Sequence, residues 1–409
     1  MPNLFLAVGY NEKIIIVKKF KIVVKTFAGL ESVLAAELNA LGAESVTPER
    51  RAVSFIGDKA LMYKANFLLR TALKVLRPVV QFNVNSRDDL YNHAKRINWS
   101  DYLTLGKSFS IDSTVQSDLF VNSMYASLKV KDAIADYFRE SFGKRPSVNQ
   151  EDPDIRIHVY LMGDYCEISL DSSGESLHKR GYRMGQGEAP INEVLAAGMI
   201  LLSGWNGESD FMDPMCGSGT FLIEAAMIAR GIPAGIYRKS FAFEKWLDFD
   251  EQLFSEIYNA DYEKESAARI FGSDIAVQSC AIARANIKNA GLSKAIEVEA
   301  KDFLVLDPPF ENGIIITNPP YGERMKPQSI AELYKSVGDV LKQKYAGYNA
   351  WIISSSEEGF RNIGLKPSRK IELFNGSLAC SFRKFELFSG TYKEKVILKK
   401  ANPSTPSTD

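Results

Sequence analysis

Histidine and cysteine are scarce in this chain of 409 residues, which has three histidines and four cysteines. The histidines are His93, His158 and His178, and the cysteines are Cys166, Cys216, Cys280 and Cys380. No two cysteines form a CxxC pair, and no histidine stands at a spacing typical of metal ligands. We therefore expect no metal site and no disulfide framework. Dispersed free cysteines are typical of the reducing cytoplasm.

Long apolar runs are also missing. A membrane-spanning helix needs about 18 or more consecutive apolar residues, and no such stretch occurs. The first residues, MPNLFLAVG, lack the basic start and the long apolar run of a secretory signal. We therefore expect a cytoplasmic protein with no membrane segment.

Net charge is absent as well, because 50 Lys and Arg balance 50 Asp and Glu. The charge is nevertheless uneven along the chain. Between residues 51 and 100, nine Lys or Arg stand against three Asp or Glu, an excess of six positive charges. Such a window is either a set of solvated helix faces or a patch that contacts phosphates.

Apolar periodicity predicts an α+β front half. The expected elements are strands within 14–26, a helix over 27–42, a strand pair over 46–57, a helix over 61–75, strands over 76–85 and 108–115, a helix over 122–143, and a hairpin of 155–161 with 165–170. Residues 1–20 are expected to form an extension. Residues 173–190, rich in Gly, Ser and charge, are expected to form a linker.

The back half, residues 191–394, alternates helices with short apolar strands at 270–273, 296–299, 314–317 and 350–354. This alternation is typical of a doubly wound α/β fold with a mostly parallel sheet. The tail, 395–409, is expected to be disordered in its last residues.

A glycine-rich turn opens this back half, in the sequence Asp213-Pro-Met-Cys-Gly217-Ser-Gly219-Thr220. Glycines between a strand and a helix let the backbone approach a ligand closely, although many α/β turns need glycine for geometry alone. The turn is not a phosphate loop, because no lysine follows Gly219. It is not a dinucleotide motif either, because Leu222 occupies the third glycine position. An acid before the glycines suits a cationic ligand.

Two further acids, Asp274 and Asp302, follow the next two predicted strands. An acid at the second strand of such a fold binds ribose hydroxyls, and ligands bind at the carboxyl ends of the strands. Together with Asp213, they predict a nucleoside-type ligand.

The sequence Asn318-Pro319-Pro320-Tyr321 ends the fourth predicted strand and is the most specific signal in the chain. The two prolines fix the backbone and remove two donors. The Asn318 oxygen and a nearby carbonyl can then accept both hydrogens of one exocyclic amine. Tyr321 offers a ring on which a base can stack.

With these motifs the chain resembles the amino-group methyltransferases that use S-adenosyl-L-methionine. More closely, DPMCGSGTFLIEAA, TNPPYGERM and SLHKRGYR resemble the THUMP-domain ribosomal RNA guanine-N2 methyltransferases of the RlmL type, over roughly residues 21–390. The resemblance implies a Rossmann-like methyltransferase domain at 191–394. It also implies a ferredoxin-like region at 21–62 and a THUMP RNA-binding domain at 63–172.

The resemblance also implies site residues and partners. Catalytic residues would be Asn318, Pro319, Pro320 and Tyr321. The cofactor, S-adenosyl-L-methionine, would be bound by Asp213, Cys216, Gly217, Gly219, Thr220, Asp274, Ile275, Asp302, Phe303 and Asn318. RNA would be bound by Lys129, Lys131, Arg180 and Arg183, and the partner would be ribosomal RNA or a ribosomal precursor. Residues 231–263, an insertion after the first helix, either line the RNA path or place their aromatic residues in a core.

Two alternatives remain open from the residues themselves. The NPPY motif does not separate a guanine-N2 target from an adenine-N6 target in DNA or RNA. A non-catalytic RNA-binding protein on a methyltransferase scaffold is the other alternative, although all four motif residues and the three acids are intact.

Overall fold

The structure, a computed structural model, describes residues 18–120, 122–184, 190–320 and 327–390. The chain forms two compact units. The first contains the residues up to Gly181 together with 193–198 and 232–263. The second contains 182–192, 199–231 and the residues from Lys264 onward.

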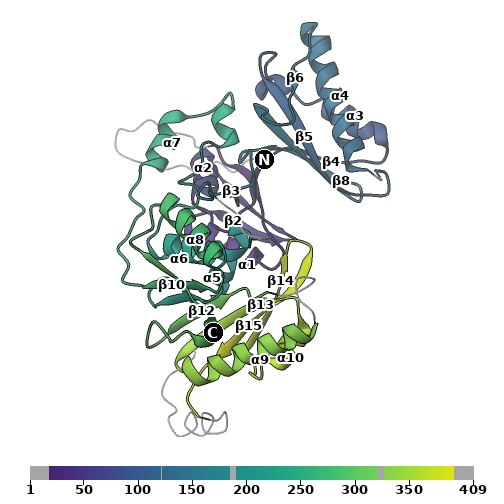
Figure 1. Ribbon diagram of the computed structural model, residues 1–409. Coiled ribbons are helices and arrows are strands. Elements are labelled where there is room, and N and C mark those ends of the chain that lie inside the picture. Colours follow the sequence, from purple (N-terminus) through teal and green to yellow (C-terminus); the bar gives the residue numbers. More distant parts are fainter. Residues whose placement is uncertain (1–17, 121, 185–189, 321–326, 391–409) are drawn as a thin grey trace. The chain divides into compact units, whose positions relative to one another are not determined.

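The first unit is built on one eight-stranded sheet in the order β2-β3-β1-β4-β8-β7-β5-β6 (Figure 1). Its strands are β1 (Phe20–Lys25), β2 (Glu44–Glu49), β3 (Ala52–Gly57), β4 (Lys74–Asn83), β5 (Ser108–Gln116), β6 (Ser147–Val148), β7 (Ile155–Met162) and β8 (Tyr165–Asp171). Its helices are α1 (Glu31–Ala40), α2 (Lys59–Leu68), α3 (Arg87–Lys95), α4 (Ser123–Phe142) and α7 (Glu251–Tyr258), with short 3₁₀ turns η1 (Trp99–Asp101) and η2 (Ala242–Lys245). Strand β7 alternates buried and half-buried residues along its whole length, as a strand with one face on a core should.

The predicted helix over 61–75 is wrong in its second half, because α2 ends at Leu68 and β4 begins at Lys74. Two backbone amides just after the helix, those of Arg70 and Thr71, donate to the Glu37 carboxylate at 2.8 and 3.0 Å. Strand β4 then pairs with both β1 and β8. Tertiary pairing of this kind overrides the local helical pattern.

Helix α3 was not predicted from the apolar periodicity, although the residues at its start carry a local signal for a helix. Ser86 Oγ accepts from Asp89 N at 3.2 Å, and Asp89 Oδ2 accepts from Ser86 N at 2.9 Å, which together form a capping box.

Substitution of Ser86 by alanine is expected to destabilise α3 locally. Loss of an N-cap hydroxyl costs about 1 kcal/mol, so amide exchange in α3 should quicken by about fivefold. The matched control is S147A, since the Ser147 side chain is exposed and makes no hydrogen bond with the described residues. Equal exchange rates in both variants would contradict the capping role.

The insertion of residues 231–263 contributes to the core of the first unit. Phe243 is fully buried and stacks on Tyr63, with ring centroids 4.3 Å apart. Phe241 and Trp246 are also buried. Of the two alternatives for these aromatic residues, the structure supports the core.

The second unit carries a seven-stranded sheet in the order β11-β10-β9-β12-β13-β15-β14. Its strands are β9 (Phe211–Asp213), β10 (Ile270–Asp274), β11 (Ile296–Ala300), β12 (Gly313–Thr317), β13 (Tyr348–Ser354), β14 (Arg369–Asn375) and β15 (Leu378–Glu386). Strands β9 to β13 pair in parallel, and β15 joins β13 antiparallel. The four predicted strands of this half are confirmed as β10, β11, β12 and β13.

Helices flank this sheet. They are α6 (Thr220–Ala229), α8 (Val277–Asn289), α9 (Pro327–Lys344) and α10 (Glu357–Asn362), with a short turn η3 (Phe303–Val305). Helix α5 (Glu193–Leu202) is divided between the units, since residues 193–198 belong to the first and residues 199–202 to the second. Helix α6 packs on β9 and β10, and α8 packs on β10 and β11. Helices α9 and α10 pack together beside β13 and β15 (Figure 1). No helix in the described part of the chain has the length and apolar character needed to cross a bilayer.

Candidate active site

The candidate site lies where the strand order of the second unit reverses. The chain runs from β9 outward through β10 to β11 and then returns to β12 on the other side of β9. Thr317, the last residue of β12, donates from Oγ1 to Asp213 Oδ1 at the end of β9, over 2.8 Å. In open α/β sheets ligands bind at this switch point, at the carboxyl ends of the strands.

The glycine-rich turn joins β9 to α6 at this edge. Gly217 and Gly219 have φ of +52° and +81°, values that favour glycine. A Cβ on Gly217 would meet no described atom within 4 Å, so the backbone here faces open space. The Gly217 amide donates to Asp274 Oδ2 at 3.0 Å, which couples the turn to the end of β10.

Asp213 is 1% exposed and carries the most informative titration in the site. Burial is the main reason that the pKa of Asp213 is raised to about 7, and the nearby Asp274 contributes in the same direction. Hydrogen bonds from Thr317 and from the Met215 amide act in the opposite direction. A buried acid with such a pKa is a candidate for a functional group.

The other two predicted acids each end a neighbouring strand segment. Asp274 Oδ1 accepts from the Ala276 amide at 2.9 Å. Asp302 Oδ1 accepts from the Leu304 amide at 2.9 Å and thereby caps η3. Beside them, Ile275 is 72% exposed and Phe303 is 3% exposed. The three acids thus follow three adjacent parallel strands, as the sequence predicts.

Asn318 follows Thr317 directly and has an unusual environment. Its Oδ1 atom is buried and has no hydrogen-bond partner among the described residues. Pro319 is buried and Pro320 is exposed. A buried acceptor without a donor costs about 1–3 kcal/mol, so such a group calls for a functional explanation. Tyr321 lies outside the described residues.

Comparison with known families agrees with this geometry. The family model of the RMKL-like methyltransferase domain matches residues 180–384. The THUMP domain model matches residues 84–171, and the RlmL ferredoxin-like domain model matches residues 21–76. The chain belongs to this methyltransferase family.

Whole-chain relatives support the assignment. The Synechocystis protein slr0064, named provisionally as an RNA methyltransferase, is 37% identical over 88% of this chain and 95% of its own. A Psychromonas ingrahamii protein named ribosomal RNA large subunit methyltransferase K/L is 37% identical over 94% of this chain. The match covers 53% of that protein, so this chain spans about half the length of the K/L relative.

A solved structure is similar over almost the full length. SMU.472, provisionally named a methyltransferase and crystallised with S-adenosylhomocysteine, is 32% identical with a TM-score of 0.82, over 91% of this chain and all of its own. The predicted fold class is therefore confirmed. The predicted cofactor, S-adenosyl-L-methionine, is confirmed for the family.

The residues of this methyltransferase fit that cofactor. The open backbone at Gly217 leaves room for a ligand against the turn. The buried Asp213 carboxylate suits the cationic methionine part, while Asp274 and Asp302 suit hydroxyl and amine donors. The individual contacts of these residues, and those of Cys216, Thr220, Ile275 and Phe303, remain predictions. Cys216 and Thr220 are buried at 6% and 3% exposure.

Arg183, which the sequence predicts to contact RNA, donates hydrogen bonds to the glycine-rich turn. Its Nη2 donates to Thr220 Oγ1 at 2.9 Å, and its Nη1 donates to Ser218 Oγ at 3.2 Å. Asn286 on α8 supports the same turn through Nδ2, which donates to the Ser218 carbonyl at 3.0 Å. The sequence analysis missed Asn286, because nothing local distinguishes it from other helical asparagines.

Replacing Arg183 with glutamine is expected to weaken cofactor affinity by about tenfold, since loss of charge-assisted bonds to the turn costs on the order of 1.5 kcal/mol. Calorimetric titration with S-adenosylhomocysteine measures this. The matched control is R361Q, because Arg361 is exposed on α10. Unchanged affinity in R183Q would show that the turn keeps its shape without the arginine.

The remaining predicted RNA contacts fall in the first unit. Lys129 and Lys131 lie on α4, where they pair with Asp88 at 3.2 Å and Asp132 at 3.1 Å. Arg180 is 1% exposed and donates to the carbonyls of Leu177 and Arg70 at 3.0 and 2.6 Å. This burial argues against the predicted direct contact of Arg180 with RNA, because its guanidinium faces backbone carbonyls and not solvent. Lys129 and Lys131 stay predictions.

The described residues contain no group of three or more His, Cys, Asp or Glu side chains that could hold a metal ion. All four cysteines are free and buried. Cys280 Sγ lies 3.4 Å from the Glu299 carbonyl oxygen and 3.5 Å from that of Asp274.

Proposed function

We propose that this protein methylates the exocyclic N2 amine of a guanine in large-subunit ribosomal RNA, with S-adenosyl-L-methionine as the donor. The observation that carries the proposal is the buried, unpartnered Oδ1 of Asn318 beside the Asp213–Thr317 pair. A neutral acceptor without a donor among the described residues fits a substrate group that brings hydrogens. An exocyclic amine has two of them.

The choice of RNA rests on the first unit and on the relatives. The first unit matches the THUMP domain model, a domain expected here to bind RNA, and two relatives of this chain are named as RNA methyltransferases. The K/L relative is named for the large ribosomal subunit. We propose the same RNA class for this chain, and the cytoplasm as its compartment.

The mechanism follows from the chemistry of the amine. When bound, the cofactor supplies a methyl group that its sulfonium already activates for transfer. A guanine amine is a weak nucleophile, because its lone pair is delocalised into the ring. Asn318 Oδ1 would accept one of its hydrogens and the Pro319 carbonyl the other, which favours a nitrogen with an available lone pair. Solvent takes the proton that the methylated nitrogen loses.

Positioning completes the reaction. Holding the amine at attack distance replaces a bimolecular encounter with an intramolecular one. A base within a helix must first leave its stack, at a cost of a few kcal/mol. Asn318 and the rigid prolines after it provide a fixed acceptor for such a base.

The test is nucleoside mass spectrometry of protein-free large-subunit ribosomal RNA after incubation with the enzyme and the methyl donor. N2-methylguanosine is the expected product. N6-methyladenosine instead would move the target to adenine and keep the mechanism. No methylated nucleoside, with cofactor binding intact, would favour the non-catalytic RNA-binding alternative.

A further inference from the structure

A cavity of about 340 Å³ lies within the first unit. Three segments line it: residues 152–156 before and at the start of β7, residues 173–181 after β8, and residues 237–245 of the insertion. Five cationic side chains and two carboxylates line the cavity. They are Arg156, Lys179, Arg238, Lys239 and Lys245 against Asp152 and Glu175.

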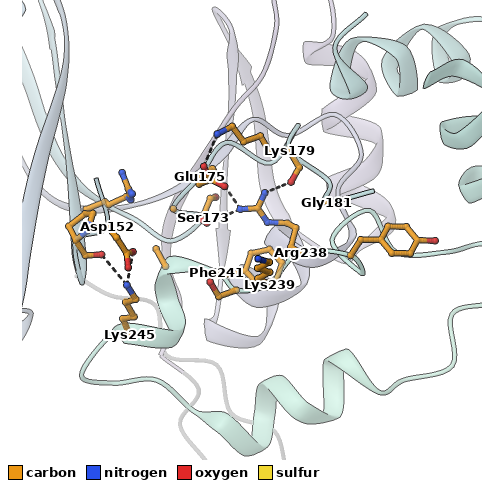
Figure 2. Close-up of a pocket in the computed structure, with 15 residues that line it drawn as sticks. Asp152, Ser173, Glu175, Lys179, Gly181, Arg238, Lys239, Phe241 and Lys245 are labelled. Atoms are coloured by element: carbon orange, nitrogen blue, oxygen red, sulfur yellow. Dashed lines mark hydrogen bonds and ion pairs between the residues drawn. The ribbon is translucent and has the colours of Figure 1, made fainter. Parts of the chain in front are cut away.

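Arg238 lines this cavity and is held in place by hydrogen bonds to backbone carbonyls (Figure 2). Its Nη1 donates to the carbonyls of Lys179 and Ser176 at 2.8 and 3.1 Å. Its Nη2 donates to those of Glu175 and Ser173 at 2.9 and 3.4 Å. Four carbonyl bonds tie the 173–181 segment to the insertion, but carbonyl oxygens do not cancel the positive charge.

Gly181, at the end of the 173–181 segment, lies against the backbone of the insertion. It has a φ of +107°, and a Cβ there would lie 2.2 Å from the Tyr237 carbonyl oxygen. Only glycine fits at this point, so the segment and the insertion run in close contact. Residues 173–181 of the expected linker therefore pack as part of the first unit.

Two of the lining cations are already paired. Lys179 contacts Glu175 at 2.6 Å, and Lys245 contacts Asp152 at 2.9 Å. These pairs account for both carboxylates.

The other two side chains at the surface, Arg156 and Lys239, form no ion pair within the described residues. Arg156 donates to the Glu151 carbonyl at 2.9 Å and has no carboxylate partner among the described residues. Lys239 is exposed and makes no hydrogen bond or ion pair within the described part of the chain. With Arg238 behind them, they leave the cavity with an excess of three positive charges.

We propose that this cavity binds a backbone phosphate of the RNA substrate. The inference rests on the proposed function, which supplies the RNA. A small, fixed, cationic recess fits a phosphodiester, whose charge and oxygens suit guanidinium and ammonium donors. A phosphate contact positions the RNA and carries no sequence information. The cavity therefore adds affinity without selecting the target base.

The test measures binding of in vitro transcribed large-subunit ribosomal RNA to the full chain by filter retention. In R156Q/K239Q, the dissociation constant is expected to rise by about tenfold near 0.1 M salt, and the slope of log affinity against log salt should fall by about one. The matched control is R361Q/K370Q, which removes two exposed charges from the second unit. Its affinity should stay within about twofold of the wild type.

Equal losses in both double variants, or no loss in R156Q/K239Q, would overturn the phosphate site while the proposed function stands. Cofactor affinity and thermal unfolding of R156Q/K239Q should equal those of the wild type, since both side chains are at least partly exposed. A wild-type protein that neither binds nor methylates this RNA overturns the proposed function, and the phosphate site with it.

Discussion

The N318A variant is expected to lose methyl transfer by about 10²–10³-fold in kcat, the range seen when one preorganised hydrogen-bonding group is removed from an active site. Asn318 Oδ1 is buried without a partner in the described structure, so its hydrogen-bonding capacity is available to the substrate amine. Truncation removes the acceptor that holds the nitrogen lone pair toward the methyl group. Single-turnover rates with ribosomal RNA measure the chemical step directly.

The matched control is N312A. Asn312 is an exposed asparagine that precedes the amino end of the same strand, β12. Its replacement should leave kcat within about twofold, as is usual for surface positions. Cofactor affinity of N318A should change far less than kcat, because the proposed partner of the amide is the substrate amine and not the cofactor. If N318A lost cofactor affinity in proportion to rate, Asn318 would be a cofactor-binding residue and not a positioner of the amine.

The geometry of the candidate site was largely predictable from the sequence, because its parts lie at strand ends. Asp213, Asp274 and Asn318 each end or follow a short apolar strand, and parallel strands bring such residues to one edge. The turn glycines are also encoded locally, since positive φ favours glycine. What the motif could not show is the unpartnered state of Asn318 Oδ1, because that depends on everything packed around it.

The contacts of the arginine side chains were the features least predictable from the sequence. In sequence, Arg180 and Arg183 look alike, as basic residues in a glycine-rich stretch. In the structure, Arg180 is buried against carbonyls and Arg183 donates hydrogen bonds to the glycine-rich turn. Arg238 lies in the insertion and binds four carbonyls more than fifty residues earlier in the chain. Composition does not reveal whether a guanidinium meets solvent or backbone, because long-range packing decides it.

The same limit applies to the division of the chain. The insertion of residues 231–263 follows α6 of the second unit in sequence, yet residues 232–263 belong to the first unit. Their aromatic residues pack on Tyr63, almost two hundred residues earlier. Periodicity describes neighbours along the chain, so it predicted most of the helices and strands but not the packing of residues 232–263 in the first unit.

Asp213 provides the second large effect, a pH dependence of cofactor binding. With a pKa of about 7, the carboxyl is mostly protonated near pH 6 and mostly ionised near pH 8. The ionised form attracts a cationic ligand, so affinity for S-adenosyl-L-methionine should rise by about tenfold across this interval. In D213N the affinity should be weak and independent of pH.

The raised pKa of Asp213 predicts that the stability of the folded protein falls with rising pH, whereas cofactor affinity rises. The folded pKa of Asp213 is raised above the ordinary value of 3.8, so the folded state holds a proton that the unfolded state releases. The stabilisation is complete below about pH 4 and is lost as the pH rises through about 7. D213N, which cannot ionise, should therefore unfold at a higher temperature than the wild type near pH 8 and at a similar temperature near pH 4.

Calorimetry distinguishes this explanation from a general effect of pH. A cationic ligand beside Asp213 lowers the pKa of its carboxyl, so binding near pH 6.5 should release about three-quarters of a proton, seen as a dependence of the binding enthalpy on the buffer. The matched control is D261N, since Asp261 is exposed in the first unit. Proton release that persists in D213N would assign the titration to another group, whereas its loss in D213N alone would place the cationic part of the cofactor at Asp213.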